Sequence, residues 1–152
     1  MAKELNRIKK DTWRDTGIYF HRSMLPLRFT KRGGEMLRYA KRKGEGIPKS
    51  DPRYKRRYTG RKERKFGHTD PMVYTGESKG IARIRDVRST SKGVKIVIGA
   101  RKLNFRHPKS KIQMNVEIRR VTTQETNKLA NEHDKNLDRR LKQIGTTKTT
   151  TV

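Results

Sequence analysis

Apolar residues recur at helical spacing along the first 24 positions of the chain. The residues on this stripe are Leu5, Ile8, Thr12, Thr16 and Phe20, with Trp13 beside them. The pattern predicts an amphipathic helix from about Lys3 to Met24 that packs on a small sheet. Gly17 weakens this helix, and Pro26 ends it or begins a turn.

The next stretch has no comparable pattern. We expect a short helix from about Glu35 to Lys43, surrounded by glycines and prolines that interrupt regular structure. Positions 44–67 follow neither the period of a helix nor that of a strand. This predicts a long basic arm or loop, and a loop of this length is usually functional or disordered.

Alternating apolar and polar positions then predict a small antiparallel sheet of three or four strands. The first strand is expected from Ile81 to Arg88, and a turn at Ser91–Gly93 leads into a second strand from Val94 to Ala100. Leu103–Ser110 is a connector that contains Pro108. The clearest alternation lies in Lys111–Val121, which is predicted as a third strand.

The last segment has the marks of a closing helix. Thr122 and Glu125 have the spacing of a capping box, in which each side chain accepts a hydrogen bond from the other residue's backbone N–H. An apolar stripe follows at Leu129, Ala130, His133, Leu137, Leu141 and Ile144. Gly145 is expected to end the helix. The predicted fold is therefore a single α+β domain over residues 1–145, with an N-terminal and a C-terminal helix packed on the sheet, a basic arm at about 44–67 and a flexible tail at 146–152.

Composition sharpens this picture, because apolar residues make up only 30% of the 152 residues and charged residues make up 37%. The formal net charge is +26, so the positive side chains repel one another in a compact state and favour an anionic partner. The chain has no cysteine, which excludes disulfides, cysteine metal sites and thiol nucleophiles. No apolar run is long enough for a membrane span, and the first residues lack a signal-peptide core, so we expect a soluble protein made in the cytoplasm.

The candidate chemistry for catalysis is weak. The four histidines, His21, His68, His107 and His133, have no metal-ligand spacing, and His68 with Asp70 has no nucleophile nearby in sequence. The glycines at 44, 46 and 60 lack the spacing of a phosphate-binding loop. We therefore expect no catalytic residues, no metal site, no cofactor and no enzymatic activity.

The strongest signal is a dense basic run with interleaved aromatic residues in the predicted arm. The cations expected to contact nucleic acid or another polyanion are Arg53, Lys55, Arg56, Arg57, Arg61, Lys62, Arg64 and Lys65, with Lys49 just upstream. The aromatic anchors are Tyr54, Tyr58 and Phe66, which stack on bases or hold the arm against protein. No module signature for sequence-specific recognition is present.

The six residues Pro71-Met72-Val73-Tyr74-Thr75-Gly76 follow this basic stretch and precede the predicted hairpin, strand and capped helix. This arrangement resembles the neck and tail-completion proteins of tailed bacteriophages, the connectors between head and tail. The run VTTQETNKLANEHDKNLDRRL at 121–141 resembles their closing helix, and the resemblance covers residues 71–144. It implies a structural virion protein that assembles as a ring of six or twelve copies around the DNA channel. Its partners would be portal and tail proteins, with non-specific DNA contact and no membrane.

A ribosomal or other RNA- or DNA-binding structural protein is the alternative hypothesis. Small size, high basicity and a glycine-containing extension with tyrosines are expected in that class, where RNA would order the arm. The last helix favours the phage hypothesis, because it is sparsely charged and its apolar stripe suits protein contact.

Overall fold

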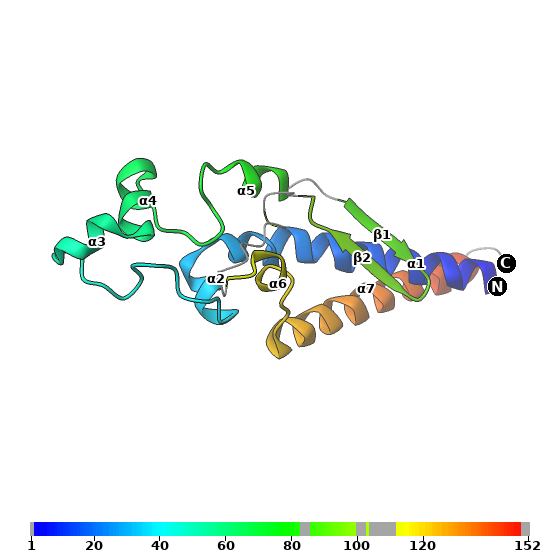
Figure 1. The fold of residues 1–152 in the computed structure, drawn as a ribbon. Helices are drawn as coiled ribbons and strands as arrows, with labels where there is room; N and C mark the ends of the chain where they lie inside the picture. The colour runs from blue at the N-terminus through cyan, green and yellow to red at the C-terminus, as the bar shows by residue number, and fades with distance from the viewer. Residues whose placement is uncertain (1, 83–85, 100–102, 104–111, 150–152) are drawn as a thin grey trace. The chain divides into compact units, whose positions relative to one another are not determined.

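The structure is a computed structural model that describes residues 2–82, 86–99, 103 and 112–149, with side chains up to residue 144. It is mostly helical and contains one two-stranded antiparallel sheet (Figure 1). The chain divides into two compact units, which we describe separately. Unit 1 comprises Met1–Met24, Arg85–Ile98 and Val121–Val152, and unit 2 comprises Leu25–Ile84 and Gly99–Arg120. No described helix combines the length and the hydropathy that a membrane span needs.

The first helix of unit 1, α1 (Ala2–Tyr19), continues into a π-helical turn, η1 (Phe20–Met24), so the helix predicted for Lys3–Met24 is confirmed. The predicted stripe is buried from Ile8 onward through Thr12, Thr16 and Phe20, whereas Leu5 is exposed. The Thr12 hydroxyl donates to the Ile8 carbonyl at 2.8 Å, and Thr16 repeats this contact one turn later. These bonds allow threonine to occupy a buried helical face.

A β-hairpin packs against α1. Its strands, β1 (Asp86–Thr90) and β2 (Gly93–Val97), pair antiparallel with Val87 opposite Ile96 and Arg88 opposite Lys95. A Cβ atom on Gly17 would lie 2.6 Å from Val87 Cγ1 and 2.8 Å from a methyl of Val94. The glycine that weakens α1 by propensity therefore provides the space in which the hairpin packs.

The predicted hairpin is confirmed, but its first strand begins later than expected. The residues Glu77–Ala82 form a helix, α5. Ile81 and Ala82, the first two residues of the predicted strand, are therefore helical. Its next three positions, 83–85, lie outside the described residues. On the outer face of the hairpin Arg88 and Lys95 are exposed directly opposite each other.

The closing helix of unit 1, α7 (Thr123–Thr149), begins with the predicted capping box. The Thr122 hydroxyl accepts from the Glu125 N–H, and the Glu125 carboxylate accepts from the Thr122 N–H, both at 3.1 Å. The helix runs through Gly145 to Thr149, so Gly145 does not end it and part of the expected flexible tail is helical.

α7 lies antiparallel to α1, as Figure 1 shows. Arg140 donates to Asp15 at 2.7 Å, and the rings of Trp13 and His133 lie 4.2 Å apart between centroids. His133 is therefore a packing residue on the predicted stripe. Leu141 on the same stripe is exposed.

Unit 2 consists of short helices and connecting loops. Besides α5, the helices are η2 (Pro26–Phe29), α2 (Lys31–Met36), α3 (Pro52–Arg56), α4 (Tyr58–Phe66) and α6 (Met114–Glu117). The apolar core comprises Leu25, Phe29, Leu37, Tyr54, Met72, Val73, Ala82, Leu103 and Ile118.

The helix predicted for Glu35–Lys43 was placed too late in the sequence. The helix α2 begins earlier, because the Thr30 side chain caps it by accepting from the Gly33 N–H at 3.1 Å. Arg38, just after the helix, has a positive φ of 53°.

Two further predictions for unit 2 are wrong. The arm predicted for 44–67 contains two helices, α3 and α4, in place of an irregular loop. The strand predicted for Lys111–Val121 contains the helix α6, so the described sheet has two strands where three or four were expected. In α6 the polar Glu117 is buried and Val116 is exposed, the reverse of the strand pattern.

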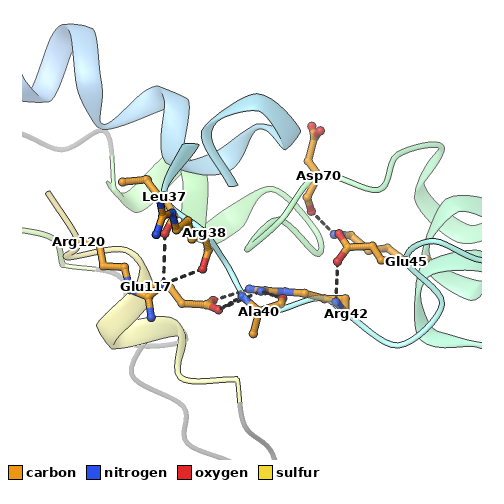
Figure 2. Close-up of polar contacts among 9 residues, drawn as sticks. Leu37, Arg38, Ala40, Arg42, Glu45, Asp70, Glu117 and Arg120 are labelled. Atoms are coloured by element: carbon orange, nitrogen blue, oxygen red, sulfur yellow. Dashed lines mark hydrogen bonds and ion pairs between the residues drawn. The ribbon is translucent and has the colours of Figure 1, made fainter. Parts of the chain in front are cut away.

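The hydrogen bonds of the Glu117 carboxylate explain why Glu117 is buried and Val116 is exposed. The Glu117 carboxylate accepts from both guanidinium NH₂ groups of Arg42, at 3.1 and 2.7 Å, and from the Ala40 N–H at 2.7 Å (Figure 2). Arg120 donates to the carbonyls of Leu37 and Arg38 at 3.2 and 2.7 Å. Glu117 and Arg120 therefore fasten α6 and the turn after it to residues 37–42.

Arg28 also binds the residues that follow α6. Its side chain is fully buried, and it donates to the carbonyls of Ile118 at 3.0 Å and Arg120 at 2.8 Å. These acceptors are the free carbonyls that follow α6, which a buried helix end must satisfy. Arg28 thus serves as a capping group supplied from residues distant in sequence.

Removing the Glu117 carboxylate should destabilise unit 2 strongly. Glu117→Ala leaves the largely buried Arg42 guanidinium without a counter-charge, and we expect a loss of about 3–5 kcal/mol in the free energy of unfolding, measured by urea denaturation. The matched control is Asp86→Ala, which breaks the exposed Asp86–Arg88 pair and should cost at most about 1 kcal/mol. Equal losses for the two variants would contradict the assignment of Glu117.

Candidate polyanion-binding surface

The two helices α3 and α4 have clear local start and stop signals. Asp51 caps α3 by accepting from the Arg53 N–H at 2.8 Å, and Pro52 occupies the first helical position. α4 ends at Gly67, whose φ of 72° is left-handed and whose N–H donates to the Glu63 carbonyl at 2.7 Å. These signals were present in the sequence but are spread over helices of five and nine residues, too short for a visible period.

Glu63 joins the two helices to the loop before them. Its carboxylate accepts from the Tyr54 hydroxyl at 2.8 Å and from the Lys49 ammonium at 2.5 Å. These two hydrogen bonds lower the pKa of Glu63, and burial together with the same contact raises the pKa of Tyr54. The aromatic ring of Tyr54 is buried in the core, so it anchors α3 against the protein.

Six of the eight cations predicted to contact a polyanion are exposed and have no ion pair with a described carboxylate. We call this set the α3–α4 basic surface: Lys55, Arg56, Arg57, Arg61, Arg64 and Lys65. Arg53 is also exposed, but its guanidinium binds Asp51 at 2.7 Å. The surface therefore presents uncompensated positive charge on a helical hairpin.

Lys62 differs from the other seven cations. Its side chain is buried, and its ammonium donates to the Asp70 carbonyl and lies 5.9 Å from the centroid of the Tyr58 ring. Burial is the main cause that lowers the pKa of Lys62 below its ordinary value of 10.5. Lys62 therefore belongs to the interior of unit 2, not to the α3–α4 basic surface.

The three predicted aromatic anchors also differ in how far they pack against the protein. Phe66 packs edge-on against Tyr74, with the centroids 4.6 Å apart, so like Tyr54 it holds the hairpin to the protein. Tyr58 is partly exposed and is the ring most accessible to a ligand.

The histidines of the described part of the chain each lie in their own local surroundings. No three His, Asp or Glu side chains there gather as metal ligands. His21 is buried within η1, His68 lies near the Phe66 ring, and His133 contacts Trp13 and Asp134. His107 lies outside the described residues.

One group of residues near the surface was missed by the sequence analysis. Tyr74, Thr75 and Ser78 line a cavity that also includes Tyr58 and Lys62 of α4. Nothing in the local pattern marks these residues, because they meet α4 only when the chain turns back after Gly67.

The comparisons with known proteins leave the family open. A scan against protein-family models gives no match, and searches of the curated proteins and of the solved structures give none either. Inference about function therefore rests on the geometry and the charge of the described residues.

The α3–α4 surface depends on a close approach of the two helices at Gly60. A Cβ atom there would lie 2.2 Å from the Tyr54 carbonyl oxygen, so Gly60→Ala should lower the free energy of unfolding by about 1–3 kcal/mol. The control is Gly80→Ala in α5, where nothing lies within 4 Å of the added atom; it should stabilise by about 0.5–1 kcal/mol through helix propensity. A stabilising Gly60→Ala in urea denaturation would show that α3 and α4 do not pack this closely.

Proposed function

We propose that this chain is a non-enzymatic structural protein that binds the phosphate backbone of nucleic acid through the α3–α4 basic surface. The observation that carries this proposal is the set of six exposed cations without carboxylate partners among the described residues. Lysine and arginine on such a surface neutralise phosphates and release counterions, which drives binding without reference to sequence.

The form of the surface fits backbone contact better than base recognition. α3 and α4 contain five and nine residues, and two of the three interleaved aromatic rings, Tyr54 and Phe66, are committed to packing. Backbone contacts position a protein on nucleic acid, whereas base-edge contacts specify a sequence. We therefore expect binding with little sequence preference.

We further propose that the protein works at the head–tail junction of a tailed phage, in the virion. The resemblance of residues 71–144 to neck proteins supports this setting. Pro71, Met72 and Val73, the first three residues of the six that carry this resemblance, are all buried in unit 2. A protein with so little apolar core gains burial by assembling with identical neighbours, as a ring of six or twelve copies would provide. In such a ring the basic surface would meet DNA in the channel.

Charge reversal of the surface tests the polyanion contact. We expect Arg56→Glu, Arg57→Glu, Arg61→Glu and Arg64→Glu together to weaken DNA binding and to reduce the slope of log affinity against log salt by about 3–4. The matched control reverses four exposed lysines of unit 1, Lys9, Lys10, Lys128 and Lys135, which changes the net charge equally. Equal losses for both variants in a fluorescence-anisotropy titration would show that net charge alone, and not this surface, binds DNA.

Solution mass tests the phage setting. We expect nuclease-treated protein in high salt to elute as a discrete species of six or twelve copies, measured by light scattering on a sizing column. A monomer that assembles or gains helical content only when RNA is added would contradict the ring and favour an RNA-associated protein.

A further inference from the structure

Unit 2 contains a cavity of about 190 Å³ beside α4. Tyr58 and Lys62 of α4 line one part of it, and residues 69–78 supply most of the rest, with Leu103 and Met114. This volume far exceeds the space for one water molecule. Tyr58 and Tyr74 are 37% and 49% exposed, so the cavity reaches solvent beside these two rings.

Lys62 brings an incompletely satisfied charge to this cavity. Only 4% of the residue is exposed, and its ammonium has a single hydrogen-bond partner among the described residues, the Asp70 carbonyl. An ammonium has three N–H donors, and no described carboxylate forms an ion pair with this one. Burial lowers the pKa of Lys62 more than the nearby Asp70 and Glu45 carboxylates raise it, so the charge is compensated only in part.

Several hydroxyl groups around the cavity are also available. Tyr58, Thr69, Thr75 and Ser78 line it, and none of these hydroxyls forms a hydrogen bond with another described residue. The other charged lining residues are already engaged. The Arg42 guanidinium is held by Glu117, and the Glu45 carboxylate accepts from the Arg42 N–H at 2.6 Å.

We propose that this cavity binds one phosphate group, with Lys62 as its charged ligand and the surrounding hydroxyls as further donors. A phosphate has enough acceptor oxygens to take hydrogen bonds from an ammonium and several hydroxyls together, which a carboxylate with two oxygens satisfies less fully. The group belongs either to a nucleic-acid backbone or to free phosphate. The site uses none of the six exposed cations, so it stands whether or not the α3–α4 basic surface binds nucleic acid.

Calorimetric titration of the full chain with inorganic phosphate, after nuclease treatment and at fixed ionic strength, tests this site. We expect saturable binding of one phosphate per chain. Lys62→Met should weaken it by at least about tenfold, the loss expected for a charge-assisted contact. Lys31→Met is the matched control, because it removes an exposed cation of unit 2 that lines neither the cavity nor the α3–α4 basic surface, and it should leave phosphate binding unchanged.

Further variants and ligands keep the test decisive. Ser78→Ala removes one hydroxyl without changing charge, and it should weaken phosphate binding even if Lys62→Met proves unstable. The proposal is overturned if wild-type protein shows no saturable phosphate binding, if Lys62→Met matches Lys31→Met, or if acetate binds as tightly as phosphate.

The source of the phosphate group is found by repeating the titration with a saturating DNA oligonucleotide. Loss of phosphate binding would place a backbone phosphate in the cavity, and unchanged binding would assign the cavity to free phosphate. The charge-reversal variant of the α3–α4 surface separates the two proposals, because it should lose salt-sensitive DNA binding and still bind inorganic phosphate.

Discussion

Arg28 and Glu117 are buried with the few apolar side chains of unit 2, and the partly buried Arg42 pairs with Glu117. Each of these charges has its partners supplied by a distant part of the chain: Arg28 by the carbonyls after α6, and Glu117 by Arg42 and the Ala40 N–H. Breaking any of these contacts leaves an uncompensated charge in a low-dielectric interior. The position of α6, and through it the loop at 37–42, therefore depends on this polar network as much as on hydrophobic burial.

The need to pair buried charges divides the cations of this chain into those with partners inside the protein and those without. A chain with a net charge of +26 contains far more cations than its carboxylates can neutralise. Those with fixed partners, such as Arg28, Arg42 and Arg120, hold unit 2 together. The six exposed cations of the α3–α4 basic surface have no carboxylate partner among the described residues. Lys62 lies between the two classes, buried like the first and incompletely paired like the second.

Elements with strong local signals were predictable from the sequence. The apolar stripe of α1, the hairpin turn and the capping box at Thr122 and Glu125 each depend on residues close together in the chain. The strand predicted for Lys111–Val121 failed because alternation cannot reveal that Glu117 meets Arg42, 75 residues away. The α3–α4 hairpin was missed because its short helices are fixed by Gly60 and Glu63. In the candidate site, Arg61 and Lys62 look alike in sequence, yet helical geometry exposes one and buries the other.

The charged outer face of the β-hairpin bears on how the protein avoids aggregation through its sheet edges. In a two-stranded sheet each strand leaves one edge unpaired, and such edges invite pairing with other chains. Arg88 and Lys95 face each other across this sheet and are both exposed. Their repulsion weakens the hairpin slightly, because like charges directly opposite each other are unfavourable, and the Asp86–Arg88 pair offsets part of this loss. The same repulsion opposes stacking of one hairpin on another, so this small loss of stability protects the protein from fibril-like association at high local concentration.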